Sequence, residues 1–565
     1  MSTAAKGPGM ADNDRIWLKN YEPGVQHDVE PEFNSIVDMM EESFDTYRLR
    51  PAFTCMGKTI TFDYLDQYSR EMAAYFQSRL GLSKGDRIAL MMPNILQYPI
   101  ALFGALRAGL VVVNVNPLYT ARELEHQLKD SGAETIVILA NFAHVLEEVV
   151  DKTNVKNIIT TELGDMLNFP KSFLINFVVK HLKKMVPSFS LPNAVGFNQC
   201  LGEGSTLDYK RPEMGLTDMA FLQYTGGTTG LSKGAILNHS NIVTNVAQAT
   251  QWISNVTTKG EDIIITALPL YHIFSLTANC FTFSSIGAHN ILIPNPRDIP
   301  GFVKELSKWQ FSAFTGVNTL FNALLANEDF CKLDFSKLRC TLGGGMAVQK
   351  VVADKWVKVT GHTMSQAYGL TETSPAATMN PFTLPEFNGS IGLPISSTYV
   401  SIRDDDGAEV KLGEPGEIWI KGPQVMQGYW NKPEETAKVM SDGWFKTGDI
   451  ATMNEEGYVT IVDRKKDMIL VSGFNVYPNE IEEVVVAHPD ILEAAAIGIP
   501  DSKTGEAIKV FLVKNDPSKE VTVDSLIAHC RDGLTGYKVP KNFEFRDDLP
   551  KTNVGKILRR ALRDG

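Results

Sequence analysis

The chain has 565 residues, 44% of them apolar and 21% charged, and a net charge of −12. This length predicts more than one domain and a large buried core, and the composition is typical of a globular protein. The acidic balance argues against a general nucleic-acid-binding protein, because such proteins present a basic face to the phosphates. The six cysteines show no metal-binding spacing, which predicts reduced, mostly buried thiols in a cytoplasmic protein.

The first thirty residues are polar and lack the apolar core of a secretion signal, so residues 1–30 are predicted to form an N-terminal tail. Helix and strand signals then alternate, which predicts an α/β fold with parallel sheets and helical crossovers. The expected helices are near 65–80, 95–108, 122–131 and 240–251, and the expected strands near 87–92, 111–113, 135–139, 263–267 and 290–293.

The stretch 263–296 contains no acidic or basic residue and is long enough to span a bilayer. It is interrupted by Pro269, His272 and Gly287, among others. A buried strand, loop, helix and strand therefore fits this stretch better than a transmembrane helix.

Short strands and tight turns begin near residue 397, including an Asp406-Gly407 hairpin signal. They predict a small β subdomain over 397–463 that closes a large domain, residues 31–463. The charged run from Asp463 to Asp467 lies where the pattern of short strands and turns gives way to an α/β pattern. This position predicts an interdomain hinge at 464–468. Residues 469–565 return to an α/β pattern and are expected to form a smaller, mobile C-terminal domain.

Residues 224–234 read Tyr-Thr-Gly-Gly-Thr-Thr-Gly-Leu-Ser-Lys-Gly, a composition suited to binding a phosphate chain. Glycine lets successive backbone N–H groups converge on phosphate oxygens, and the hydroxyls and Lys233 add donors and charge. The segment departs from the P-loop pattern, because Ser232 replaces the second glycine and Gly234 replaces the Mg²⁺-binding hydroxyl residue. A flexible turn is the alternative, but triphosphate binding explains the composition better.

Four further features follow in the chain: residues 366–372 (Gln-Ala-Tyr-Gly-Leu-Thr-Glu), residues 444–449 (Trp-Phe-Lys-Thr-Gly-Asp), Arg464, and residues 550–556 (Pro-Lys-Thr-Asn-Val-Gly-Lys). Each alone could be ordinary structure. Together, in this order, they resemble the adenylate-forming superfamily of acyl-CoA synthetases, luciferases and peptide-synthetase adenylation domains, from about residue 35 to the end. Segments 267–274 and 443–480 most resemble bacterial long-chain fatty-acid–CoA ligases.

The resemblance implies an enzyme that joins a fatty acid to AMP from ATP, with Mg²⁺, and then passes the acyl group to coenzyme A. It implies that the ATP phosphates are bound by Tyr224, Thr225, Gly226, Gly227, Thr228, Thr229, Gly230, Lys233 and Gly234. It implies that the adenosine is bound by Gly343, Gly344, Gly345, Tyr368, Gly369, Asp449 and Arg464.

The resemblance also assigns the residues nearest the chemistry. Thr371 would contact the α-phosphate, Glu372 would hold Mg²⁺, and Lys556 would reach the carboxylate and the α-phosphate. Lys466 falls at the pivot of the C-terminal domain, and Gly473 would line the path of the CoA pantetheine arm.

An acyl pocket is expected from stretch 263–296 and from residues around Val317. Burying about eight further methylenes would contribute roughly 6 kcal/mol, at about 0.8 kcal/mol each, so pocket depth could set chain length. His272 could flank the substrate carboxylate or be a hydrogen-bonded core residue.

Segment 169–186 combines apolar side chains with Lys180, Lys183 and Lys184. This basic amphipathic pattern suits a peripheral contact with the inner face of the cell membrane. A helix packed against the protein core would have the same sequence pattern. The resemblance further implies a homodimer.

Three rival functions are kept open. The first is an adenylating ligase for a medium-chain or aryl acid, or one that loads a carrier protein. The second is a P-loop kinase or ATPase, which the departures at Ser232 and Gly234 disfavour. The third is a lipid-binding peripheral membrane protein without catalysis, which would leave Lys556 and the glycine loop without a role.

Overall fold

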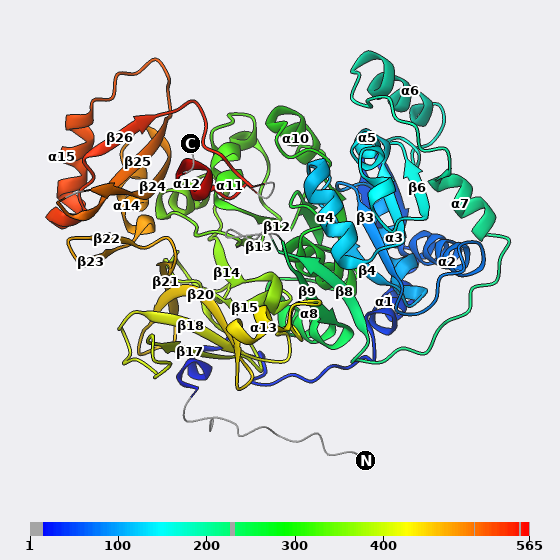
Figure 1. The fold of residues 1–565 in the computed structure, drawn as a ribbon, viewed down its shortest axis with the longest axis horizontal. Coiled ribbons are helices and arrows are strands. Elements are labelled where there is room, and N and C mark those ends of the chain that lie inside the picture. The colour runs from blue at the N-terminus through cyan, green and yellow to red at the C-terminus, as the bar shows by residue number, and fades with distance from the viewer. Residues whose placement is uncertain (1–14, 226–231, 502, 553–554, 564–565) are drawn as a thin grey trace.

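The computed structural model describes residues 15–225, 232–501, 503–552 and 555–563. Figure 1 shows a large N-terminal part and a smaller C-terminal part that lies against one end of it. The large part contains two mainly parallel sheets and one antiparallel sheet, and the C-terminal part contains a fourth sheet. The predicted α/β class is confirmed.

The first sheet is parallel except where its last two strands, β8 and β9, pair antiparallel. In spatial order its strands are β7 (Ala194–Gly196), β6 (Asn157–Thr161), β5 (Thr135–Leu139), β3 (Arg87–Met91), β4 (Val111–Asn114), β8 (Met219–Tyr224) and β9 (Gly234–Asn238). All five residues of β5 are buried, as expected for a parallel strand covered on both faces.

The second sheet has a parallel centre and antiparallel edges. Its strands are β16 (Leu393–Pro394), β15 (Ala376–Met379), β14 (Ser365–Gly369), β13 (Cys340–Gly343), β12 (Ala313–Gly316), β10 (Ile263–Thr266), β11 (His289–Leu292), β1 (Pro51–Cys55) and β2 (Lys58–Thr61). Because parallel strands end at the same edge, β12, β13 and β14 bring their following loops together.

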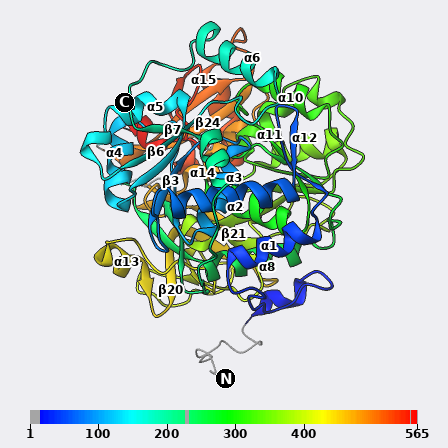
Figure 2. The same cartoon turned by 90° about the vertical axis from the view of Figure 1, so that its right-hand side faces the viewer.

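A continuous apolar core that includes residues of β3, α3, α8 and η6 joins the two sheets. Separate clusters cover the far face of each sheet. The helices of the large part are α1 (Ile36–Thr46), α2 (Phe62–Ser78), α3 (Gln97–Arg107), α4 (Ala121–Ser131), α5 (Ala143–Glu147), α7 (Phe197–Gly204), α8 (His239–Ile253), α10 (Ile299–Leu306), α11 (Asn318–Leu325) and α12 (Lys350–Thr360). Figure 2 shows α1 and α2 on the face away from the C-terminal part.

The uncharged stretch is a buried strand, loop, helix and strand, as predicted. It runs from β10 through α9 (Ile273–Ser275) and the π-helical η6 (Leu276–Phe283) to β11. Across the described parts of the chain, every helix is too short or too polar to cross a bilayer.

The β subdomain consists of β17 (Tyr399–Arg403), β18 (Gly416–Lys421), β19 (Met440–Ser441), β20 (Trp444–Met453) and β21 (Val459–Arg464). Helix α13 (Pro433–Val439) precedes β19. The described end of the predicted N-terminal tail, residues 15–30, is packed rather than free. The Trp17 side chain is buried in the core, and the Tyr21 hydroxyl donates to the Pro394 carbonyl at 2.5 Å. Its apolar residues explain this difference, because they gain by leaving water.

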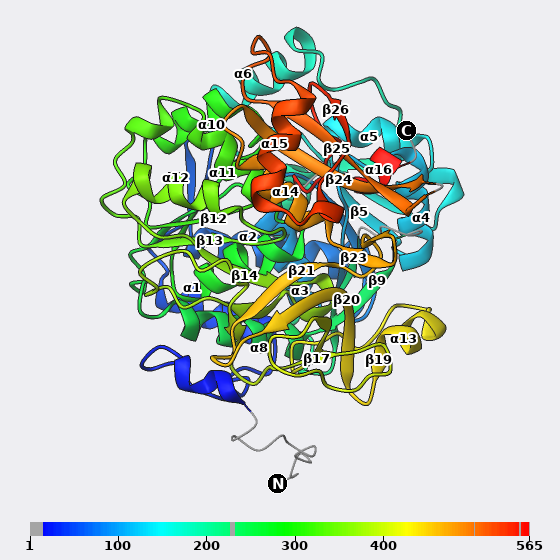
Figure 3. The same ribbon diagram turned by 90° about the vertical axis from the view of Figure 1, so that its left-hand side faces the viewer.

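Segment 169–186 forms α6 (Lys171–Phe177) and the π-helical η5 (Val178–Leu182), and neither element has a buried residue. The core-packed alternative for this segment is therefore wrong. Phe169 is 85% exposed, and Phe173 and Leu182 are each 68% exposed. Helix α6 lies at the periphery of the molecule in all three views (Figures 1, 2 and 3).

The C-terminal part begins at β22, five residues after β21 ends at Arg464. Its strands are β22 (Ile469–Val471), β23 (Phe474–Val476), β24 (Ile491–Asp501), β25 (Gly505–Lys514) and β26 (Asn542–Phe545). Its helices are α14 (Pro478–Val486), α15 (Val523–Gly533) and α16 (Arg559–Arg563). These elements enclose their own apolar core, and Figure 3 shows them from the side of the C-terminal part.

Candidate functional site

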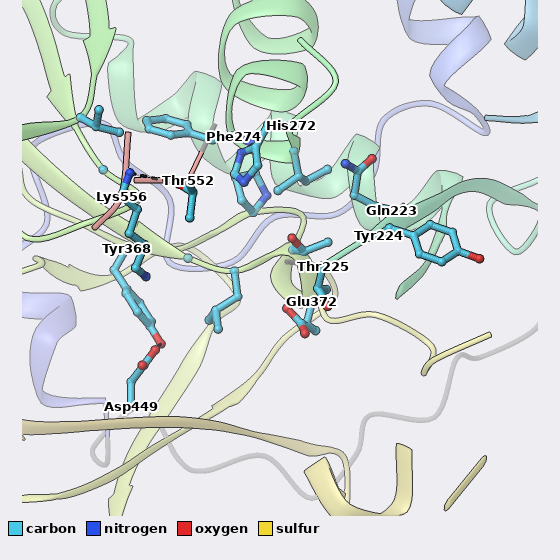
Figure 4. Close-up of a pocket in the computed structure, with 18 of the residues that line it drawn as sticks. Gln223, Tyr224, Thr225, His272, Phe274, Tyr368, Glu372, Asp449, Thr552 and Lys556 are labelled. Carbon is cyan, nitrogen blue, oxygen red and sulfur yellow. Dashed lines mark hydrogen bonds between the residues drawn. The ribbon is translucent and has the colours of Figure 1, made fainter. Parts of the chain in front are cut away.

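A cavity of about 1460 Å³ lies where the two large sheets, the β subdomain and the C-terminal part meet (Figure 4). One set of lining residues is polar and includes Glu372, Asp449, Arg464, Lys466 and Lys556. Another set is apolar and includes Leu268, Phe274, Ala278, Val317, Leu342 and Met379. The cavity can therefore accept a molecule with a charged end and an apolar end.

The glycine loop joins β8 to β9, and its two described ends are tied together. The Thr225 N–H donates to the Lys233 carbonyl at 3.0 Å. Thr225 and Lys233 line the cavity. The predicted phosphate-binding residues Gly226, Gly227, Thr228, Thr229 and Gly230 lie outside the described residues.

Tyr224 lines the cavity, but its hydroxyl points away from Glu372 in Figure 4. That hydroxyl donates to Asp130 Oδ2 at 2.8 Å. Gly234 packs behind it, since a Cβ there would lie 3.1 Å from the Tyr224 ring. Gly234 is not among the described residues that line the cavity, so the structure gives this glycine a packing role.

Lys233 and Glu372 each contact a residue in or just before α13. The partner of Lys233, Glu435, lies in the helix, and the partner of Glu372, Tyr429, lies before it. The Lys233 ammonium pairs with Glu435 and lies 5.1 Å from the centre of the Tyr429 ring. The Tyr429 hydroxyl donates to Glu372 Oε1 at 2.6 Å. Sequence analysis missed both partners, which lie 57 and 202 residues away from Glu372 and Lys233 in the chain.

Glu372 lies in the short turn η8 (Thr371–Thr373) and is 9% exposed. Burial raises the pKa of its carboxyl group, and the bond from Tyr429 acts in the opposite direction. No cluster of three or more metal-binding side chains exists within the described ranges. A single buried carboxylate beside a phosphate site fits Mg²⁺, a hard cation that takes oxygen ligands largely from phosphates and water. Thr371 lines the cavity next to it.

The glycines after β13 differ in what surrounds them. A Cβ on Gly344, which lines the cavity, would lie 3.0 Å from the Phe274 ring and 3.2 Å from the Ala367 carbonyl, so little space is left there for a side chain. Gly345 also lines the cavity, with a φ of +75°. Gly343 does not face the cavity among the described residues; it packs against Val348, 2.5 Å from the position of a Cβ. Glycine is required there for packing.

Strand β14 places Tyr368 and Gly369 at the polar end of the cavity. The Tyr368 hydroxyl donates to Asp449 Oδ2 at 2.6 Å (Figure 4). Asp449 on β20 is paired in register with Arg464 on β21, whose Nε lies 3.4 Å from Asp449 Oδ1. Gly369 passes so close to the Pro375 carbonyl that a Cβ would lie 1.8 Å from it.

Three of the basic residues that line the cavity lie together: Arg464, Lys466 and Lys556. Burial and then Arg464 lower the pKa of Lys556 to about 7. Burial and Arg464 also lower the pKa of Lys466. Lys556 ends a turn in which the Thr552 N–H donates to the Lys556 carbonyl at 2.6 Å. Cations buried together in this way favour an anionic ligand, which would restore their charged forms.

His272 has features of both predicted roles, a hydrogen-bonded core residue and a residue beside the substrate carboxylate. Its Nδ1 accepts a hydrogen bond from the Phe274 N–H at 3.3 Å, and the side chain lines the cavity. Burial, followed by Lys556, lowers the pKa of His272 to about 4, so the imidazole is neutral at physiological pH.

Gly473, another predicted site residue, lies away from the cavity lining. It occupies the turn between β22 and β23 with a φ of +81°, and a Cβ there would meet nothing within 4 Å. It is not among the described residues that line the cavity.

Comparisons with known proteins agree with this architecture. The sequence pattern of the AMP-binding enzyme family matches residues 40–430, and that of the AMP-binding enzyme C-terminal domain matches residues 480–556. A long-chain-fatty-acid–CoA ligase of Yersinia pestis is 59% identical over 98% of this chain and 98% of its own length. A protein of the same name from Escherichia coli O157:H7 is 57% identical over 97% of this chain and 98% of its own.

Among solved structures, ATP-bound MatB from Rhodopseudomonas palustris matches with a TM-score of 0.81 and 26% identity, covering 94% of this chain and 99% of that one. The fold and the sequence therefore indicate the same family. The chain belongs to the AMP-binding enzyme family, the adenylate-forming enzymes that its motifs resemble.

Proposed function

We propose that this chain is an AMP-forming long-chain fatty acid–CoA ligase. One observation carries the proposal: a single cavity joins an apolar set of residues to a cluster of three cations. The relatives from Yersinia pestis and Escherichia coli, which carry that name, support the same substrate class.

The first step activates a carboxylate, which is a poor electrophile. A carboxylate oxygen attacks the α-phosphorus of ATP, the bond to the β-phosphate oxygen breaks, and pyrophosphate leaves. Catalysis of such a transfer consists mainly of positioning and charge stabilisation. Lys556 stabilises the negative charge at the reacting groups, and Lys233 and Thr225 bind the leaving phosphates.

Glu372 and the phosphates would hold Mg²⁺, which supplies further neutralisation of phosphate charge when bound. Binding of ATP requires Lys233 to exchange its carboxylate partner Glu435 for phosphate. Tyr429 holds the Glu372 carboxylate in place. Asp449 and Arg464 bind the ribose, and Gly344 and Tyr368 border the adenine.

In the second step the thiol of coenzyme A attacks the acyl carbon and AMP leaves. Gly473 lies outside the cavity in this structure, so its predicted role requires the C-terminal domain, residues 469–565, to turn about the hinge at 464–468. Lys466 is the pivot, and the turn withdraws Lys556 and brings Gly473 to the pantetheine path.

We extend the proposal to a peripheral contact between segment 169–186 and the inner face of the cell membrane. Phe173 and Phe177 stack with ring centroids 6.2 Å apart on the exposed face of this segment. Lys180, Lys183 and Lys184 are exposed beside them, which suits an anionic lipid surface. A homodimer stays a prediction from the resemblance, to be measured by sedimentation.

A series of acids tests the substrate class. We expect acids of medium to long chain, saturated or unsaturated, to give AMP and acyl-CoA much faster than acetate or benzoate, because the apolar set of cavity residues gains from each buried methylene. The measurement is AMP formation with and without CoA. Equal or faster turnover of acetate or benzoate would contradict the long-chain assignment, and acyl transfer only to a carrier protein would favour that alternative.

The two half-reactions should be separable by mutation. Lys556→Ala should slow adenylate formation by about two orders of magnitude or more, as loss of a charge-stabilising group does, and still convert supplied acyl-adenylate to acyl-CoA. Gly473→Leu should do the reverse, and Lys466→Pro should impair the second step more than the first, since proline fixes φ. Single-turnover reactions started from acid plus ATP, and from purified adenylate, measure each step.

The control for backbone strain is Gly413→Leu. Gly413 also has a positive φ, +85°, and open space around its Cβ position, but it lies in the β subdomain. Both half-reactions should survive this change. Parallel loss of both steps in all three site variants would contradict the turning of the C-terminal domain.

The charge of Lys556 should appear in the pH dependence of adenylation. A lysine with a pKa of about 7 is charged below that pH and neutral above it, so kcat/KM for ATP, which reports the free enzyme, should fall as pH rises through this value. Arginine stays charged throughout, so Lys556→Arg should be slower but lose this alkaline decline. An unchanged decline in the Arg variant would assign it to another group.

Vesicle binding tests the membrane contact. The double substitution Phe173→Ser and Leu182→Ser should weaken binding to vesicles that contain anionic lipid by roughly tenfold or more, because each side chain contributes about 1.5–3 kcal/mol when buried. Leu49→Ser is the matched control, since Leu49 is 87% exposed outside the segment. Equal binding by the double variant and the wild type would refute the contact.

A further inference from the structure

One buried carboxylate belongs to the large part of the protein yet receives its hydrogen bonds largely from the C-terminal part. Asp463, next to last in β21, is 0% exposed. Its Oδ2 accepts from the Asn479 N–H at the start of α14, at 2.8 Å. Its Oδ1 accepts from the neighbouring Arg464 N–H at 2.7 Å and from Arg559 Nη1 at 3.3 Å.

Arg559 is the first residue of α16 and follows Lys556 by three positions. It forms a two-pronged bond with Glu482, from Nε to Oε1 at 2.9 Å and from Nη2 to Oε2 at 2.8 Å. Its Nη1 also lies 3.5 Å from Oδ2 of Asp467, the residue that follows Lys466 in the sequence. The guanidinium therefore joins α14, the turn that carries Lys556, and both ends of the predicted hinge.

These contacts divide into two classes. Arg559 and Glu482 both lie in the C-terminal part and would move together if it turned. The bonds from Arg559 and Asn479 to Asp463 cross the hinge, and a turn about residues 464–468 has to break or rebuild them. The hydroxyl of Thr319 on α11 makes another such contact, to the Gly555 carbonyl at 3.1 Å.

Asp463 depends on these donors. Burial raises its pKa to about 6, and Arg559 is the strongest influence in the opposite direction. A buried carboxylate that loses its cationic partner is strongly unfavourable. The arrangement is thus stable only while the C-terminal part is docked with Lys556 in the cavity.

We propose that Asp463 and Arg559 form a latch that holds Lys556 in the adenylate-forming position, which makes Arg559 a positioning residue for the first half-reaction. The proposal rests on the proposed function, and in particular on the two half-reactions using different placements of the C-terminal part. It predicts that weakening the latch harms adenylate formation and spares, or favours, thioester formation.

The experiment measures both half-reactions in single turnover for Asp463→Asn, Arg559→Gln and the double variant. Asp463→Asn preserves shape and removes the charge. We expect either single change to slow adenylate formation from acid plus ATP at least tenfold, and to leave thioester formation from purified adenylate within about twofold of wild type. If the two residues act as one latch, the double variant should be little slower than the slower single variant.

Arg546→Gln is the matched control, because Arg546 is an arginine of the same part that pairs with Glu544 at 2.8 Å, inside that part. It should leave both steps unchanged. A distance measurement between labels on the large and C-terminal parts gives a second readout, and Asp463→Asn should shift the population away from the docked arrangement.

Parallel loss of both steps in Asp463→Asn, or normal adenylate formation in both single variants, would overturn the latch. Failure of the proposed function looks different. In that case the wild-type enzyme itself would make no adenylate or pyrophosphate from a fatty acid and ATP.

Discussion

The cations at the polar end of the cavity are the constraint on which the rest of the structure depends. Arg464, Lys466 and Lys556 repel one another in a partly buried space, and among the described residues no carboxylate lies within ion-pair distance of the Lys556 ammonium. Such a group of charges is stabilised by anions entering from solution. In the proposed function these anions are the substrates, and the C-terminal part supplies Lys556 to them.

The remaining walls of the cavity follow from the same requirement. The acyl substrate has one charged end, and the part that distinguishes a fatty acid from acetate is apolar. Thr277 and Ala278 of the π-helical η6 line the cavity, and stretch 263–296 contains no Asp, Glu, Lys or Arg. Neutral His272 and Gly344 line the same cavity.

Much of the fold was predictable, because a strand that is buried on both faces of a sheet has a continuous run of apolar residues. Strand β5 has the predicted bounds, 135–139, and α8 extends the predicted helix 240–251 by only a few residues. Lys556 and Glu372 were identified through the resemblance to a known family; both line the cavity, and their roles stay predictions. Amphipathic segment 169–186 was ambiguous, because a bilayer and a protein core select the same apolar pattern.

Other features could not be predicted from the residues themselves. A glycine permits close approach by a ligand or by a neighbouring side chain, and the sequence does not say which; Gly234 and Gly343 pack against Tyr224 and Val348. The bonds from Tyr429 to Glu372 and from Arg559 to Asp463 join residues 57 and 96 positions apart. Neither tyrosine nor arginine has a local pattern that names such a distant partner.

The way in which the two parts meet is suited to the turn of the C-terminal part that the proposed function requires. Val351 packs against the C-terminal core, but several contacts are single hydrogen bonds, such as Thr319 to Gly555 and Asn322 to Leu492. Water can replace a hydrogen bond at a net cost of about 1 kcal/mol, whereas a large apolar interface would cost energy in proportion to its area. A polar interface with a buried ionic contact can therefore hold a defined position and still release it, as the proposed movement of Lys556 requires.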